Sequence, residues 1–170
     1  MAILDPALPI RPSPTPTLPN GPEPLSALIF VVEGNRYAIR LADVVEVTHA
    51  AALMSPSGIE SSLIGYLDLR GEVLPVLGVR ELLALPSRAL RLTDRFVVVR
   101  TGPRRAAIVV DRVDGVEDVG LIASPGNDRH DGMTIGRRVG ATEGEAIVAL
   151  ICLDRLLASS AVGQTGATAS

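Results

Sequence analysis

The chain has 170 residues, of which 47% are hydrophobic, enough for one folded domain or for two small, tightly joined ones. All 16 basic residues are arginine, so a phosphate-binding loop lysine, a Schiff-base lysine and a kinase strand lysine are excluded. The net charge of −3 argues against a nucleic-acid partner, because nucleic-acid binding needs a concentrated basic face.

The N-terminal segment has the composition of an extended arm. Residues 1–24 contain eight of the 13 prolines, and each proline fixes φ and removes a backbone donor. We therefore predict a disordered, Pro-rich arm over 1–24 and interpret it as a tether, although spacings such as Pro16 to Pro19 leave an SH3-type ligand open. No basic cluster marks a secretory signal, and no segment reaches the roughly 18 apolar residues of a membrane span, so no direct membrane insertion is expected.

The folded region is predicted to span residues 25–160, and its first half has the pattern of short strands joined by tight turns. Gly34-Asn35 is the first expected hairpin turn, because both residues tolerate positive φ, and Arg70-Gly71 is the second. The expected elements are strands at 28–32, 37–41, 44–48, 64–69 and 73–77 and a helical turn at 80–83, which stops before Pro86.

The second half has the same pattern. Gly102-Pro103 is expected to join its first two strands and Glu143-Gly144 its last two. Because the chain beyond Ser160 consists mainly of Ala, Gly, Thr and Ser, residues 161–170 are predicted to be a disordered tail. The expected elements are strands at 96–100, 106–110, 113–119, 139–142 and 146–151, a loop around 123–131 and a short closing helix at 154–158.

The two halves also resemble each other residue by residue. Arg36-Tyr37-Ala38-Ile39 is echoed by Arg105-Ala106-Ala107-Ile108, and the apolar run after Gly71-Glu72 is echoed by the run after Gly144-Glu145. Both echoes lie about 70 residues downstream and in the same order, which indicates two copies of one β-rich module. We therefore predict small barrels or sandwiches, with one subdomain at about 25–92, another at about 93–160, and an exchange of strands between them left open.

The sequence offers little that indicates catalysis. Cys152 is the only cysteine and lies in an apolar run, so we interpret it as a buried structural thiol. No GxSxG, HExxH or glycine-rich phosphate motif is present, and the spacing around His130 matches no established calcium or zinc pattern. We predict no enzyme activity, no cofactor and no metal. A small β-barrel that binds a metal or ligand through the loop at 123–132 stays open. Because packed barrels create grooves that suit partner helices or barrels, the residues alone favour a binding module.

One segment carries a family resemblance. The run Gly65-Tyr66-Leu67-Asp68-Leu69-Arg70-Gly71-Glu72-Val73-Leu74-Pro75-Val76 resembles the Leu-Arg-Gly region of the CheW-like domain of bacterial chemotaxis. The resemblance implies a mainly β fold of two small five-stranded SH3-like β-barrel subdomains packed side by side, with short helices, in agreement with the duplication. It extends over about 27–159 and includes Tyr37-Ala38-Ile39 with Val44 and Glu46, residues 108–113, and Leu153 to Leu157.

The resemblance implies a non-catalytic adaptor that couples chemoreceptors to a CheA-type histidine kinase. In that family one barrel meets the kinase's own CheW-like regulatory domain, and a groove between the barrels receives the helix pair of the receptor tip. The expected partners are therefore the regulatory domain of a CheA-type kinase and the cytoplasmic tip of a methyl-accepting chemoreceptor. The expected location is the cytoplasm, at membrane-associated receptor arrays.

The resemblance also implies a set of interface residues. Arg70, the arginine of the Leu-Arg-Gly motif, is expected to be critical for binding and to pair with Glu46. The chain departs from the family pattern at Asp68, where Asn is usual. This departure and three others leave open a divergent adaptor of a non-chemotactic kinase pathway. The other departures are Gly78, Gly115 and Cys152, where acids are common. The full expected partner-binding set is Arg70, Glu46, Gly71, Asp68, Leu69 and Val44.

Overall fold

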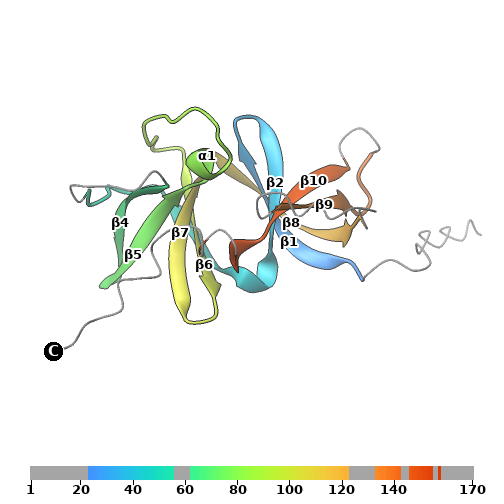
Figure 1. The fold of residues 1–170 in the computed structure, drawn as a ribbon, viewed down its shortest axis with the longest axis horizontal. Coiled ribbons are helices and arrows are strands. Elements are labelled where there is room, and N and C mark those ends of the chain that lie inside the picture. Colours follow the sequence, from blue (N-terminus) through green and yellow to red (C-terminus); the bar gives the residue numbers. More distant parts are fainter. Residues whose placement is uncertain (1–22, 56–61, 123–132, 143–145, 155–156, 158–170) are drawn as a thin grey trace, which may run out of the picture.

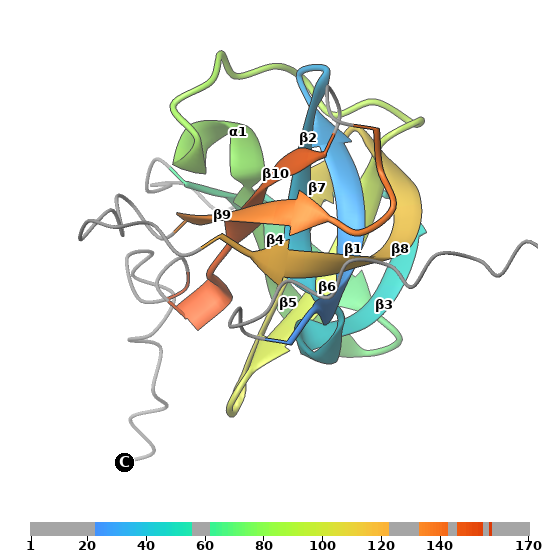
Figure 2. The ribbon, with the colours of Figure 1, turned by 90° about the vertical axis from the view of Figure 1, so that its right-hand side faces the viewer.

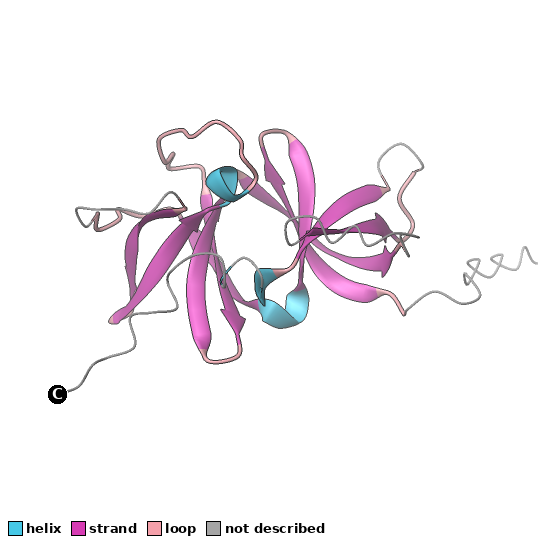
Figure 3. Cartoon of the chain, viewed as in Figure 1, coloured by secondary structure: helices cyan, strands magenta, loops and turns pink. Residues whose placement is uncertain are grey.

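Two five-stranded β-sheets lie side by side, with the few short helices between them (Figure 1; Figure 3). The fold is mainly β, as the sequence predicted. This computed structural model describes residues 23–55, 62–122, 133–142, 146–154 and 157. Most of the predicted arm, the predicted tail and the loop that contains Asp128 and His130 lie outside the described residues.

The first sheet is a closed barrel, which lies in front of the second sheet in Figure 2. Around the barrel, the strand order is β1 (Leu25–Val32), β2 (Asn35–Arg40), β10 (Ile147–Ile151), β9 (Met133–Arg138) and β8 (Arg112–Leu121). The second sheet has the order β3 (Val44–His49), β6 (Arg95–Thr101), β7 (Arg104–Val110), β5 (Glu72–Gly78) and β4 (Leu63–Leu69). The helices are η1 (Leu41–Asp43), α1 (Val79–Leu82) and a segment in which Leu153, Asp154 and Leu157 are helical.

The predicted boundary near residue 92 does not separate the two sheets, because the halves of the chain exchange strands. The barrel combines β1 and β2 with β8, β9 and β10, and the second sheet combines β6 and β7 with β3, β4 and β5. The reason lies in the connections. Only Asp111 joins β7 to β8, whereas a reversal into the same sheet needs a turn of at least two residues. The strand after the β6–β7 hairpin therefore continues into the barrel, and β3, which follows the β1–β2 hairpin through η1, lies in the second sheet.

The sequence echo falls on equivalent strands of the two sheets. Residues 36–39 lie in β2 and residues 105–108 in β7, and each strand pairs with an antiparallel hairpin partner on one side and a parallel strand on the other. The parallel partners are β10, where Leu150 lies opposite Ala38, and β5, where Val76 lies opposite Ala107. The two sheets are therefore copies of one arrangement.

The core has three layers. The strands β1 and β6 are buried on both faces, which explains their continuous apolar runs. In β1, Phe30 faces the central core between the sheets and Ile29 faces the barrel interior; in β6, Val97 faces the central core and Val98 the interior of the second sheet. The largest buried side chains of the central core are Phe30, Ile39, Leu77, Ile108 and Leu153.

The hairpin turns follow the predictions with one shift. Arg70-Gly71 and Gly102-Pro103 join their strands as expected. The first turn is Glu33-Gly34 rather than Gly34-Asn35, with φ values of 54° and 77°. The pairing of β1 with β2 explains the shift, because a slip of one residue would turn every side chain of β2 to the other face.

Two further predictions are wrong. Residues 139–142 do not form a strand: β10 pairs with β9, and Gly140 has a φ of 78°, which interrupts the extended backbone after β9. Cys152 is half-buried rather than buried, because it lies between two residues, Ile151 and Leu153, that pack into the central core. None of the helices in the described residues is long and apolar enough to cross a membrane.

Candidate interaction surface

The turn between β4 and β5 presents Arg70 to solvent. Arg70 and Gly71 have φ values of 54° and 85°, the left-handed pair that a type I′ hairpin turn requires. The Asp68 carboxylate accepts a hydrogen bond of 2.9 Å from the backbone N–H of Gly71, which fixes the turn. The Arg70 side chain, 76% exposed, therefore projects from a well-defined backbone.

Arg70 forms the expected ion pair with Glu46. The two guanidinium Nη atoms donate hydrogen bonds of 3.0 Å and 3.2 Å to the two carboxylate oxygens of Glu46. Such a bidentate pair has a defined geometry as well as charge. Because Arg70 is mostly exposed, the pair contributes only about 0–1 kcal/mol to stability.

A β-bulge turns Glu46 towards Arg70. The register of β3 against β6 shifts between Val44 and Glu46, so Val44 lies opposite Val99 and Glu46 opposite Val98. Residues directly opposite in an antiparallel pair share a face. Val44 therefore faces the central core with Val99, and Glu46 faces the other side with Val98. Without the bulge, Glu46 would share the face of Val44.

The ion pair spans the two edges of the second sheet. Glu46 lies on β3 and Arg70 directly after β4, and these strands are the first and last of the order β3-β6-β7-β5-β4. In the barrel the equivalent strands, β8 and β9, pair through their backbones and through an ion pair of 2.6 Å between Arg138 and Glu117. Among the described residues, the second sheet is closed here by the Glu46–Arg70 pair and by one backbone bridge.

That bridge joins Met54 to Tyr66 on β4 through hydrogen bonds of 2.9 Å and 2.8 Å. The segment that contains Met54 crosses directly over Gly65. A Cβ atom at position 65 would lie 2.9 Å from the carbonyl oxygen of Met54, so the crossing requires glycine at that position. This close crossing explains why glycine stands at position 65, the first residue of the motif that resembles the CheW-like domain.

The remaining residues of the expected set support this surface or flank it. Asp68 and Gly71 lie in the turn beside Arg70, whereas Leu69 and Val44 are half-buried and pack against the cores. Val47, an exposed apolar residue on β3, lies opposite Val97 and thus on the other face of the strand from Glu46.

Nothing in the described part of the chain forms a metal centre. No group of three or more His, Cys, Asp and Glu residues there could hold a metal ion. The loop with Asp128 and His130, on which the metal-binding alternative depends, lies outside the described residues.

Comparison with known families assigns the chain to one of them. A family model described as the CheW-like domain matches residues 26–161. The chain belongs to the CheW-like domain family. It is 27% identical over 89 residues to the chemotaxis protein CheW of Bacillus subtilis strain 168, a match that covers 52% of this chain and 57% of that relative. The chain thus spans little more than half the length of this relative.

The fold agrees with that of a solved CheW protein. The crystal structure of the scaffolding protein TtCheW from Thermoanaerobacter tengcongensis matches with a TM-score of 0.63 and 19% identity. The match covers 75% of this chain and 88% of the TtCheW chain. At this identity the likeness shows the shared CheW-like fold.

Two departures from the CheW-like pattern have local explanations. Asp68 keeps the side-chain oxygen that accepts the hydrogen bond in the turn, so an acid there serves the turn as Asn would. At Gly78, a Cβ atom would collide with the carboxylate of Glu81. The Glu81 carboxylate therefore occupies the space beside Gly78, and it also accepts a hydrogen bond of 2.8 Å from Ser87.

Proposed function

We propose that this chain is a non-catalytic adaptor that couples chemoreceptors to a CheA-type histidine kinase in bacterial chemotaxis. The observation that carries the proposal is the exposed, bidentate Arg70–Glu46 pair at the edges of the second sheet. A turn fixed by Asp68 and a bulge in β3 both serve to present this pair. Since such an exposed pair adds little stability, its defined geometry is better explained by recognition of a partner.

The kinase contact is proposed at this surface. The partner is the regulatory domain of a CheA-type kinase, which approaches the turn that carries Arg70 and the face of β3 that carries Glu46. The charged side chains of Arg70, Glu46 and Asp68 form the centre of this surface, and charges of opposite sign on the partner would complement them. Arg70, Glu46, Asp68 and Gly71 would contact the partner, and Leu69 and Val44 would hold the surface in shape.

The receptor contact is proposed in the groove between the sheets, where the helix pair of a methyl-accepting chemoreceptor tip would lie. The protein would then act in the cytoplasm at membrane-associated receptor arrays, without a nucleic-acid partner. Membership of the CheW-like family supports this arrangement.

Assembly of a ternary complex tests the proposal. The purified chain is mixed with the kinase regulatory domain and a soluble receptor-tip fragment from the same organism and analysed by size-exclusion chromatography with light scattering. The adaptor role predicts that both fragments co-elute only when the chain is present. Elution of all three components as separate species would contradict it.

A divergent adaptor of a non-chemotactic kinase pathway is the second candidate. The presence of Asp68 where the family usually has Asn favours this candidate. Its carboxylate adds a negative charge two residues from Arg70 on the proposed kinase surface. In this case the chain binds a kinase regulatory domain but no receptor tip. The same chromatography separates the two candidates, since only the binary complex would form.

A further inference from the structure

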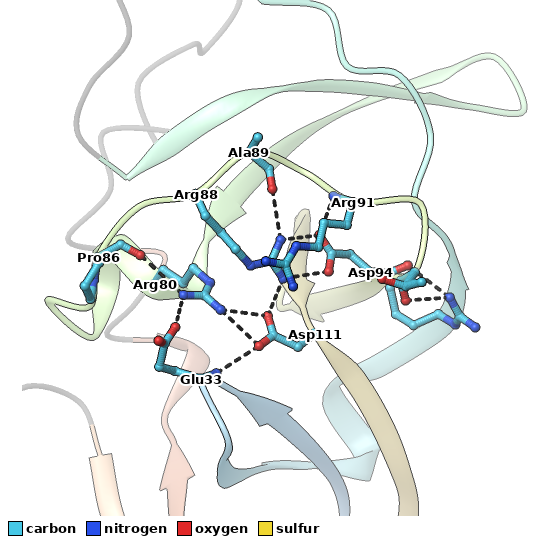
Figure 4. A network of polar contacts seen from close by, with 10 residues as sticks. Glu33, Arg80, Pro86, Arg88, Ala89, Arg91, Asp94 and Asp111 are labelled. Carbon is cyan, nitrogen blue, oxygen red and sulfur yellow. Dashed lines mark hydrogen bonds and ion pairs between the residues drawn. The ribbon is translucent and has the colours of Figure 1, made fainter.

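The loop between α1 and β6 has no regular structure, yet arginine side chains bind its backbone along its length (Figure 4). We call residues 84–94 the clasp loop. Arg80 donates to the carbonyl oxygen of Pro86 at 3.3 Å, Arg88 to that of Ala89 at 2.9 Å, and Arg95 to that of Thr93 at 2.9 Å. The backbone of the clasp loop is therefore fixed at three points.

Asp94 fixes the end of the clasp loop from inside. Its carboxylate is 1% exposed and accepts hydrogen bonds from both Nη atoms of Arg88, at 2.8 Å and 2.7 Å, and from the backbone N–H of Arg91, at 2.7 Å. Burial alone would raise the pKa of Asp94, but these donors hold it below its ordinary value. The loop thus closes on a buried, ionised carboxylate.

The same network ties the clasp loop to both sheets. Asp111, which joins β7 to β8, accepts hydrogen bonds from Arg88 at 2.7 Å and from Arg80 at 3.0 Å. It also accepts the backbone N–H of Glu33, in the turn between β1 and β2, at 2.9 Å. One buried atom of the network, Nε of Arg88, lacks a hydrogen-bond partner among the described residues. The other nitrogens of Arg88 are hydrogen-bonded to Asp94, Asp111 and the carbonyl oxygen of Ala89.

Near its C-terminal end the clasp loop exposes two leucines. Leu92 is 90% exposed and Leu90 is 37% exposed, on either side of Arg91. Leu92 is the most exposed of the large hydrophobic side chains in the described part of the chain. The guanidinium group of Arg91 has no partner among the described residues, although its backbone is held by Asp94.

Arg91 also lines a polar cleft of about 330 Å³ with Arg80, Arg88, Glu33 and Asp111. Glu33, Asp94 and Asp111 are paired with Arg80 and Arg88 in this network. Arg80 and Arg88 already bind carboxylates, which leaves Arg91 as the cation that an incoming carboxylate would meet. An acidic residue of a partner is therefore the group that complements this end of the cleft.

We propose that Leu90-Arg91-Leu92 is a preorganised docking epitope for a helix of a partner protein that carries an apolar residue and a carboxylate one turn apart. The carboxylate pairs with Arg91 and the apolar residue covers Leu92. A partner helix, rather than a strand, fits the loop, because the carbonyl groups of Pro86, Ala89 and Thr93 are already bound and do not offer a strand edge. The fixed backbone lowers the ordering cost of binding.

The proposal rests on the proposed function, in which the partner that offers helices is the receptor tip. Its test measures the affinity of the full chain for a soluble receptor-tip fragment and, separately, for the kinase regulatory domain, by calorimetry. Leu92→Ala and Arg91→Glu are the test variants. Ile135→Ala, at another exposed apolar residue, and Arg104→Glu, at the exposed arginine that begins β7, are the matched controls.

We expect each test variant to weaken receptor-tip binding by about tenfold and to leave kinase binding within about twofold of wild type. The controls bind both fragments as wild type does, and thermal melts of the test variants are unchanged because both side chains are exposed. Wild-type affinity of both test variants for the receptor tip would overturn the proposal, and so would a loss confined to the kinase domain. A wild-type chain that binds neither fragment overturns the proposed function itself, which is a separate and recognisable result.

Discussion

Arg70 and Glu46 join the first and last strands of the second sheet through two parallel hydrogen bonds of 3.0 Å and 3.2 Å. The equivalent strands of the barrel are joined by their backbones. In the second sheet the ion pair and the backbone bridge between Met54 and Tyr66 join these strands instead, and the exposed arginine can be reached by a partner. Removal of either residue changes this surface without changing the core.

The ion pair is predicted to matter little for stability. Arg70→Ala is expected to change the free energy of unfolding by about 0–1 kcal/mol, because the arginine is exposed and screened by solvent. Urea unfolding of Arg70→Ala, Glu46→Ala and the double variant gives the coupling energy directly. A coupling of several kcal/mol would show that the pair is a structural element of the fold instead.

The Asp68 carboxylate is predicted to stabilise the turn as a hydrogen-bond acceptor rather than as a charge. Asp68→Ala removes the acceptor for the Gly71 N–H and should cost about 0.5–1.5 kcal/mol in urea unfolding. Asp68→Asn keeps an acceptor oxygen and should unfold close to wild type. Equal losses in the two variants would mean that the charge, not the hydrogen bond, is what the turn needs.

Gly65 is predicted to be required by the crossing of the Met54 segment. Gly65→Ala places a Cβ atom 2.9 Å from the carbonyl oxygen of Met54 and should destabilise the fold by about 1–3 kcal/mol. Gly120→Ala is the matched control on β8, where the nearest atom to a Cβ lies 3.9 Å away. The prediction does not survive if both variants unfold at the same urea concentration.

The clasp loop is predicted to make stability sensitive to acid. Burial alone would raise the pKa values of Asp94 and Asp111, yet hydrogen bonds from Arg88 and from backbone N–H groups hold both below the ordinary value. A depressed folded-state pKa contributes stability that is present above the unfolded value of about 3.9 and is lost as the pH falls through the folded value. The free energy of unfolding should therefore be flat from about pH 7 to pH 5 and fall below about pH 4.

Asp94→Asn tests the origin of this acid sensitivity. The variant lacks one of the two titrating carboxylates, so its free energy of unfolding should be lower at neutral pH and should fall less steeply below about pH 4. Urea unfolding at a series of pH values measures both quantities. An acid slope identical to that of wild type would place the sensitivity in other carboxylates.

Much of the fold follows from local sequence signals. The echo between residues 36–39 and 105–108 marks equivalent strands, and Arg70-Gly71 marks a turn, because strand period and turn chemistry are local. The exchange of strands does not follow from the echo. It depends on how the single-residue connection at Asp111 directs β8, which local propensity does not determine.

The candidate site was only partly predictable. The pairing of Glu46 with Arg70 was expected from the family resemblance, but the bulge that turns Glu46 towards Arg70 depends on the register between β3 and β6. The clasp loop could not be predicted, because Arg88 meets Asp111 only in the folded chain, 23 residues apart in sequence. Leu92 looks like an ordinary apolar residue until the structure shows it exposed.

The most direct test of the adaptor role is the affinity of the kinase regulatory domain for this chain, measured by calorimetry with wild type, Arg70→Ala and the Arg104→Ala control. The adaptor role predicts tight binding by wild type and control, and a loss of at least about tenfold for Arg70→Ala, with thermal melts unchanged. Equal affinity of Arg70→Ala and wild type, or no binding by a folded wild-type chain, would contradict it.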